Sequence, residues 1–326
     1  MGAVETMDFE QRTDPYRREL LAHCYRMLGS VHDAEDLLQD TMLRAWRSFD
    51  RYDETRATMR TWLYRIATNA CLTALQGRQR RPLPSQLSAP WPDTDAPLVR
   101  GGEVPWLQPI PDVMSGIDAL DPALRVIQRG SLRLAFVAAL QHLPARQRAV
   151  LIMRDVLMWS AAEVAEALDT TTVAVNSTLQ RAHARMGEMG LLVDDIAEPS
   201  EAACRAMVDR YVDAFERADI AALTRLLTDD VVMEMPPIRN WFQGRQDYGR
   251  FIARSYSMRG LDWKMIPTMA NGQPACVAYT RAADGGYRIH TLQVFTVRAD
   301  GICHTTVFQD EAVFAIFELP PTLPAA

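Results

Sequence analysis

The chain has 326 residues, of which 48% are hydrophobic and 23% charged, and its formal net charge is −6. This length suits two or three domains, and the negative charge argues against a protein that coats DNA over its whole surface. No apolar run approaches the roughly 20 residues of a membrane helix, and the acidic, polar N-terminus does not resemble a secretory signal. The sequence therefore predicts a cytoplasmic protein without membrane contact.

The cysteines predict neither a metal site nor a disulfide framework. They are scattered, odd in number and without a CxxC pair: Cys24, Cys71, Cys204, Cys276 and Cys303. We therefore expect reduced, mostly buried thiols and no cofactor.

The first segments change charge along the chain. Apolar residues at helical spacing predict helices over residues 14–29, 31–48 and 60–76, with a polar loop between the last two. Acids crowd the front of the second helix, whereas aromatic residues and arginines fill the third. Acids at a helix N-terminus are also favourable without any partner. Arginine beside aromatic rings suits a nucleic acid, because guanidinium groups bind phosphate and rings stack on unpaired bases.

Residues 82–130 form a proline-rich, acidic stretch without a sustained period, which predicts a linker that is part extended and part disordered. Within it, residues 104–112 (VPWLQPIPD) are too apolar for a pure spacer. We expect this patch to dock on the chain itself or on a partner, or Trp106 to fold back locally.

Residues 131–189 predict a second helical unit. Pro144 is expected at a first helical position, and Ser160 with Glu163 predicts a capping box. A turn at residues 169–172 leads into a last helix. Its inward residues are expected to be Val175, Leu179, Ala182 and Met186. Two short helices joined by a tight turn predict a helix-turn-helix.

An acidic connector at residues 190–199 precedes a change of pattern. Residues 200–320 begin with helices near 201–218 and 220–227 and add a third near 244–258. The strands are expected at residues 231–235, 261–267, 274–281, 287–297 and 302–309. Helices followed by a long antiparallel meander predict an α+β cone.

Four motifs resemble domains of known families. DAEDLLQD (33–40) and WLYRIATNACLTALQGRQRR (62–81) resemble region 2 of extracytoplasmic-function (ECF) sigma factors, which we assign to residues 10–81. AVNSTLQRAHARM (174–186) resembles the recognition helix of sigma region 4. VDAFERADIAALTRLLTDDVVMEMPP (212–237) resembles SnoaL-like members of the NTF2-like superfamily. The resemblance implies two all-α sigma domains followed by an α+β SnoaL-like cone.

This resemblance also implies a function. A sigma factor directs core RNA polymerase to promoter DNA and opens it, and here the C-terminal domain would modulate that activity in cis. Sigma factors with such a tail often lack a neighbouring anti-sigma factor. The resemblance implies a core-polymerase surface at Asp33, Asp36 and Gln39.

The DNA-contacting residues follow from the same resemblance. The −10 element would meet Tyr52, Trp62, Asn69, Arg78, Arg80 and Arg81. Tyr52 lies in the base-capturing loop and Asn69 matches a residue that touches the extruded base, while Trp62 fits either the core or a wedge. The −35 element would meet Asn176, Ser177, Gln180, Arg181 and Arg185, because Asn and Gln suit adenine and Arg suits guanine or phosphate.

The SnoaL-like fold encloses an apolar pocket that could take a small-molecule ligand. Its expected lining is Met235, Trp241, Trp263 and His290, unless these residues form plain core. Asp229, Asp230, Glu234 and His290 are the candidate bases, but no paired acid–base constellation stands out. We therefore predict no enzyme.

Two other functions stay open on the sequence alone. One is a one-component helix-turn-helix regulator with a ligand-sensing tail. The base-capturing segment at residues 33–81 argues against it, because such a regulator does not need to capture a base. The other is a SnoaL-like cyclase or isomerase fused to a DNA-binding head.

Overall fold

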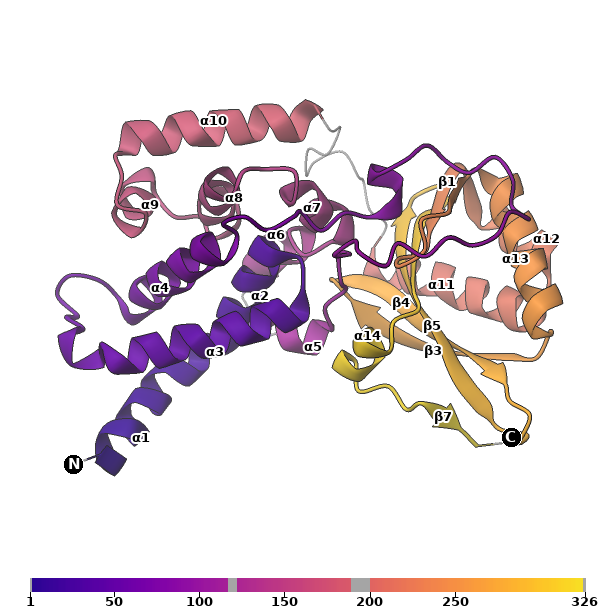
Figure 1. The fold of residues 1–326 in the computed structure, drawn as a ribbon, viewed down its shortest axis with the longest axis horizontal. Coiled ribbons are helices and arrows are strands. Elements are labelled where there is room, and N and C mark those ends of the chain that lie inside the picture. The colour runs from indigo at the N-terminus through magenta and orange to yellow at the C-terminus, as the bar shows by residue number, and fades with distance from the viewer. Residues whose placement is uncertain (1, 117–121, 189–199, 325–326) are drawn as a thin grey trace. The chain divides into compact units, whose positions relative to one another are not determined.

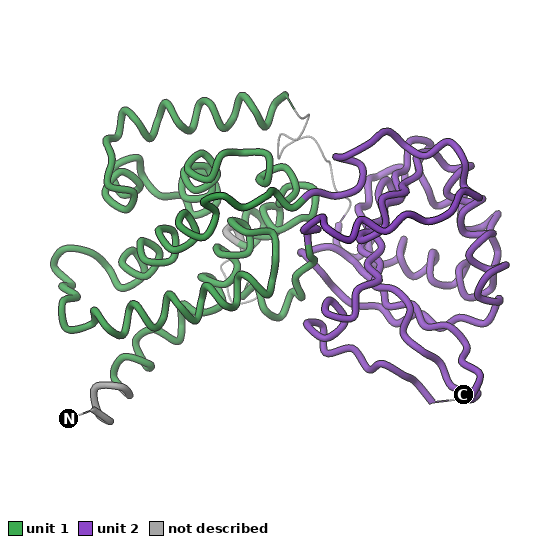
Figure 2. Tube along the Cα trace, in the orientation of Figure 1, with its two compact units in different colours: residues 1–81, 108–193 green, residues 82–107, 194–326 purple. Residues whose placement is uncertain are grey.

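The computed structural model describes residues 2–116, 122–188 and 200–324. It divides into two compact units: residues 1–81 with 108–193, and residues 82–107 with 194–326 (Figure 2). The predicted connector at 190–199 lies outside the described residues. The first half of the proline-rich segment thus belongs to the same unit as the C-terminal domain.

The first helices of unit 1 begin and end at residues with a local physical reason. Gly29, with a φ of 68°, ends the second helix in the left-handed region that glycine favours. Ser30 and Thr58 cap the next two helices by accepting hydrogen bonds from the backbone N–H groups of Asp33 and Thr61. The bounds are α1 Gly2–Thr13, η1 Asp14–Tyr16, α2 Arg17–Leu28, α3 Val31–Arg47, η2 Phe49–Arg51 and α4 Met59–Ala74.

The second half of unit 1 contains the predicted helix-turn-helix. Ser160 and Glu163 form the expected capping box, with Glu163 N–H donating to Ser160 Oγ at 3.2 Å. Pro144 stands one residue before its helix rather than at the first helical position. The bounds are α5 Asp112–Ser115, α6 Pro122–Gly130, α7 Leu134–Leu140, α8 Ala145–Leu151, a π-helical turn Ile152–Val156, α9 Ala161–Ala167 and α10 Thr172–Glu188.

Two buried arginines join the halves of unit 1. Arg26 of α2 donates from Nε to Ser131 Oγ at 3.0 Å, and Arg148 of α8 donates to the backbone carbonyl of Met27. Burial lowers the pKa of each guanidinium to about 10, so both remain charged at neutral pH. A buried charge is costly unless it is hydrogen-bonded, so these contacts favour one specific packing of the two halves.

Unit 2 is an α+β cone (Figure 1). Helices α11 and α13 pack against the sheet, and Phe215 of α11 meets Trp263 edge to face with 5.3 Å between ring centroids. The helices are α11 Glu201–Glu216, α12 Ile220–Arg225, α13 Arg245–Arg259 and α14 Glu311–Ile316. The strands are β1 Leu227–Glu234, β2 Trp241–Gln243, β3 Trp263–Ala270, β4 Gln273–Arg281, β5 Tyr287–Arg298, β6 Gly301–Phe308 and β7 Thr322–Leu323.

The sheet is mixed rather than wholly antiparallel. Its order is β2-β1-β6-β5-β4-β3, with β7 pairing β5. The expected meander from β3 to β6 is antiparallel throughout. Strand β1, however, pairs β6 in parallel, with Met233 opposite Thr305. A parallel pair needs a long crossover, which α13 and the first three meander strands supply here.

The thiols and the helix lengths agree with the composition. Each of the five cysteines is a free thiol, buried except for the half-buried Cys303. Across the described ranges, no helix is both long and apolar enough to span a bilayer.

Candidate functional site

A cluster of aromatic rings lies at the loop between α3 and α4. Tyr52 and Trp62 are half-buried, with ring centroids 4.9 Å apart, and Phe49 stacks nearly parallel to Tyr52. The guanidinium of Arg12 lies over both Phe49 and Tyr52. Asn69 is exposed on α4. The structure thus brings Tyr52 and Trp62 together, and adds Phe49 and Arg12, which sequence reasoning did not select.

The acid expected to meet polymerase and the arginines expected to meet DNA bind each other. Arg78 Nη1 and Arg81 Nη2 donate to the same Asp33 oxygen at 2.9 and 2.7 Å. Arg80 instead reaches the His142 ring at 2.8 Å. Asp33 and Arg81 are half-buried, whereas Arg78 is exposed. In this structure the ends of α3 and α4 are therefore tied through one carboxylate.

The outer face of α3 carries an unusual exposed apolar pair. Asp36 and Gln39 are exposed, and Leu43 and Trp46 follow at helical spacing with 44% and 49% of their surface accessible. Large apolar side chains at that exposure mark a binding surface when they cluster. We call Asp36, Gln39, Leu43 and Trp46 the α3 face.

Helix α10 turns its polar residues outward. Of the residues expected to face inward, Val175, Ala182 and Met186 are buried and Leu179 is half-buried, whereas the outward set is exposed or half-buried. That set is Asn176, Ser177, Gln180, Arg181 and Arg185. His183 pairs with Asp155 at 2.6 Å, and no group of metal-ligating side chains occurs within the described residues. The exposed face of α10 has the donors and acceptors that major-groove reading requires.

A polar clamp holds the linker segment 82–107 on the C-terminal domain. Asn240, which is fully buried, accepts the Val99 N–H at 2.7 Å and donates to the Pro97 carbonyl at 3.3 Å. Trp241 donates from its indole to the Ser88 carbonyl at 3.0 Å. Further backbone hydrogen bonds join Trp91 to Trp241, Val99 to Arg239 and Gly101 to Pro237.

Glu234 extends this clamp. Its carboxylate is fully buried, accepts the Ser85 N–H at 3.0 Å and lies 2.6 Å from His304 Nε2. Burial raises the pKa of this carboxyl, but His304 and the Ser85 hydrogen bond outweigh it, so the net pKa lies below its ordinary value. Glu234 therefore holds the linker as a carboxylate and is not free to act as a base.

The ends of the held segment meet. Leu107 N–H donates to the Pro82 carbonyl at 3.2 Å, so residues 82–107 form a closed loop. Trp106 folds back locally, donating to the Gly101 carbonyl at 3.1 Å. Gln108, just past the loop, docks on the first half of unit 1, where its amide oxygen accepts from Ser30 Oγ at 2.8 Å. The apolar patch 104–112 thus both folds back and docks.

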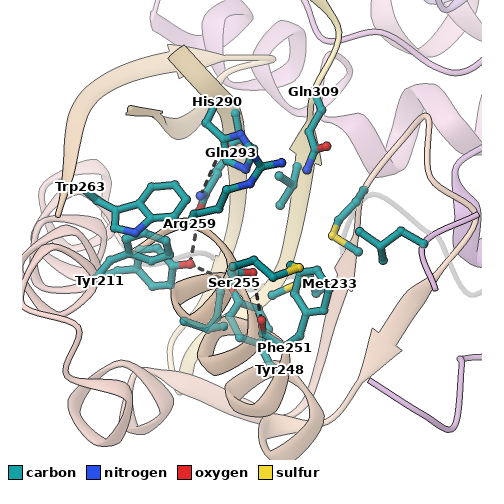
Figure 3. Close-up of a pocket in the computed structure, with 17 residues that line it drawn as sticks. Tyr211, Met233, Tyr248, Phe251, Ser255, Arg259, Trp263, His290, Gln293 and Gln309 are labelled. Atoms are coloured by element: carbon teal, nitrogen blue, oxygen red, sulfur yellow. Dashed lines mark hydrogen bonds between the residues drawn. The ribbon is translucent and has the colours of Figure 1, made fainter. Parts of the chain in front are cut away.

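A cavity with both apolar and polar lining residues lies between α11, α13 and the sheet (Figure 3). Met235, Trp263 and His290 line it. Trp241 does not, because its ring belongs to the linker clamp. Burial, followed by the nearby Arg259 guanidinium, lowers the pKa of His290 to about 4, so its imidazole is neutral at pH 7.

The candidate bases do not gather in this cavity. Asp229 pairs with Arg245 at 3.1 Å and Asp230 with Arg298 at 2.7 Å, both toward solvent. Glu234 belongs to the clamp, and only His290 faces the cavity. Among the described residues, the cavity therefore lacks the paired acid and base of an isomerase or cyclase.

Comparison with known proteins agrees with this anatomy. The family model "Sigma-70 region 2" matches residues 13–81, "Sigma-70, region 4" matches residues 133–186 and "SnoaL-like domain" matches residues 208–305. The ECF RNA polymerase sigma factor SigG of Mycobacterium tuberculosis is 48% identical over 323 residues, which is 97% of this chain and 85% of the relative. This chain belongs to the ECF RNA polymerase sigma factors.

A second relative extends over nearly the whole chain. The ECF sigma factor SigJ of the same species is 27% identical over 313 residues, covering 92% of this chain and 90% of its own length. A crystal structure of SigJ matches with a TM-score of 0.64 and 22% identity, covering 95% of this chain and 99% of that chain. That match shows a shared fold, including the SnoaL-like domain.

Membership in the sigma factors decides between the alternatives left open by the sequence. Sigma factors bind core RNA polymerase and promoter DNA and are not enzymes. The one-component regulator and the fused cyclase are therefore set aside.

Proposed function

We propose that this sigma factor is held in a closed form by its C-terminal domain, which keeps the linker between regions 2 and 4 folded into a loop. The observation that carries the proposal is the hydrogen-bonded hold of residues 85–101 on the C-terminal domain. Transcription initiation places this activity in the cytoplasm.

Region 2 supplies the contacts to polymerase and to the melted strand. The α3 face offers Leu43 and Trp46 as apolar anchors beside Asp36 and Gln39, which suits a protein partner. The ring cluster of Tyr52, Trp62 and Phe49 offers stacking surface for an unpaired base, with Asn69 nearby in sequence to hydrogen-bond it.

Region 4 supplies the upstream contact. The exposed Asn176 and Gln180 of α10 can pair with adenine edges, and Arg181 and Arg185 can bind guanine or phosphate. Elements at −10 and −35 are about 25 base pairs apart, or about 85 Å of duplex. A compact unit of roughly 170 residues has a radius of gyration of about 15 Å, so the closed unit 1 is too small to reach both elements.

Opening of unit 1 therefore needs linker length. While the loop is closed, it adds no length between regions 2 and 4, because its ends, Pro82 and Leu107, are hydrogen-bonded to each other. If the C-terminal domain released it, the loop could extend up to about 90 Å. Holding the loop limits how far region 4 can move from region 2, which gives the domain a means of control in cis. On this argument the hold is inhibitory.

Transcription in vitro with core RNA polymerase tests this proposal. Full-length protein is compared with Asn240→Ala, which weakens the hold on Pro97 and Val99, and with a chain that ends at Glu188. We expect both altered proteins to initiate from a cognate promoter more strongly than the full-length protein. Lower initiation by Asn240→Ala would show that the domain activates. Equal initiation by all three proteins would show that the C-terminal domain does not control initiation.

A further inference from the structure

The cavity of the C-terminal domain has a mixed lining and a charge of one sign. Its volume is about 80 Å³, and aromatic and methionine side chains, including Tyr211, Phe215, Met233 and Trp263, form nearly half of its lining, beside polar residues such as Gln293 and Gln309 (Figure 3). Apolar and aromatic walls with polar groups that can orient a ligand are typical of small-molecule sites. None of the 17 described residues that line it is acidic.

The polar groups at one end of the cavity already have partners. The Tyr211 and Tyr248 hydroxyls lie 2.9 Å apart, Tyr211 donates to Gln293 Oε1 at 3.3 Å, and Tyr248 Oη lies 3.1 Å from Thr305 Oγ1, whose own proton it can accept. These groups are buried and mutually satisfied. A ligand could hydrogen-bond to them only by replacing one of these partners. The groups are also neutral, so they cannot attract a charged ligand.

The charge comes from Arg259, at the solvent end. Its side chain is exposed, lies near the neutral imidazole of His290, and pairs with no carboxylate in the part of the chain that the structure describes. Arginine is the residue that most readily binds a carboxylate, because its fork matches both oxygens. The cavity therefore favours an anion over a cation.

We propose that the cavity binds a small carboxylic acid with an aromatic or compact apolar body, the carboxylate on Arg259 and the body among the aromatic walls. This ligand would regulate the proposed control in cis, and the proposal rests on that control. The link is Leu98, which lines the cavity and belongs to the held linker. Leu98 lies between Pro97 and Val99, the two residues that Asn240 holds.

The size of the cavity links the ligand to the linker. A dry protein cavity that takes up benzene measures about 150 Å³, and the present one is about half that. A ring-sized acid therefore needs a wall residue to move, and we infer that Leu98 is that residue, because it belongs to the linker rather than to the helices and strands of the domain. Ligand binding and linker docking then compete, and the ligand favours the released linker by its difference in affinity for the two states.

The ligand chemistry is tested with charge-matched fluorinated probes on the full-length protein. The affinities of 4-fluorobenzoate and 4-fluorobenzylamine are measured by ¹⁹F NMR titration. We expect the acid to bind at least tenfold more tightly than the amine. Arg259→Met should abolish that preference. The matched control Arg250→Met, on the same helix but paired with Asp247 and outside the cavity lining, should keep it. Equal binding of both probes, or an unchanged preference in Arg259→Met, would overturn the proposal.

The link to the linker has its own measurement. Leu98→Ala should tighten 4-fluorobenzoate binding severalfold, and saturating acid should speed hydrogen exchange at the Val99 and Gly101 amides of the unmodified protein. If neither changes while the acid still binds through Arg259, the competition is refuted. Both experiments measure ligand binding and hydrogen exchange, not transcription. A failure of the ligand proposal can therefore be distinguished from a failure of the proposed control in cis.

Discussion

Removing the Asn240 side chain is the sharpest perturbation of the linker clamp. This buried amide joins two linker positions at once, accepting from Val99 N–H at 2.7 Å and donating to the Pro97 carbonyl at 3.3 Å. Asn240→Ala leaves both groups without that partner. Each lost hydrogen bond costs about 0.5–1.5 kcal/mol, so the pair together costs about 1–3 kcal/mol. Because 1.4 kcal/mol is tenfold in an equilibrium constant, linker release should become about 5- to 150-fold more frequent.

Hydrogen exchange at single amides reads this change directly. In the unaltered protein, the N–H groups of Ser85, Trp91 and Gly101 are bonded to the C-terminal domain and should be protected. In Asn240→Ala their exchange should accelerate by that factor, while the amide of the buried Val277 on the interior strand β4 stays unchanged. Linker amides that exchange at unstructured-chain rates before the substitution would refute the clamp. Equal acceleration at Val277 would show general destabilisation instead.

Four further predictions concern Glu234 of the clamp and the proposed DNA-facing residues of regions 2 and 4. The pKa of Glu234 is lower in the folded protein than in the unfolded chain, so its carboxylate stabilises the fold fully at pH values above the unfolded-state pKa. This stabilisation is lost as the pH falls through the folded-state pKa. Glu234→Gln should therefore make Tm depend less on pH on the acid side. Trp62→Ala should reduce open-complex formation by about 5- to 150-fold, the value of one stacked base, while core-polymerase affinity measured by fluorescence titration stays the same. Arg185→Ala should weaken DNA binding equally on all sequences and lower the salt slope by about 1, whereas Gln180→Ala should relax preference at one base pair in a binding-site selection. An unchanged acid limb, unimpaired melting or an unchanged salt slope would each contradict the corresponding role.

Local signals allowed much of the fold to be predicted. Gly29 stops one helix, and Ser160 with Glu163 starts another, because these residues satisfy backbone groups within a few positions of themselves. The strands β3 to β6 follow one another with short turns, so alternation and turn residues suffice for them. The inward face of α10 follows from helical spacing alone.

What could not be predicted depends on contacts far apart in the sequence. Strand β1 pairs β6 across some seventy residues, and no local pattern in β1 distinguishes a parallel from an antiparallel partner. Trp241 was expected to line the pocket and Glu234 was a candidate base, yet both hold a linker more than a hundred residues earlier in the chain. The linker's prolines indicated an extended chain but gave no sign of the surface that accepts its backbone hydrogen bonds.

Asp33 shows the same limit at a predicted site. Sequence reasoning assigned Asp33 to polymerase and Arg78 and Arg81 to DNA, while in the structure one carboxylate oxygen binds both guanidinium groups. Partly exposed ion pairs are each worth about 1 kcal/mol or less, so either partner can displace them. A polymerase surface that takes Asp33 would free both arginines for phosphate. The proposed DNA contacts of region 2 would then be strongest once core polymerase is bound, which suits a factor that opens promoters only as part of the enzyme.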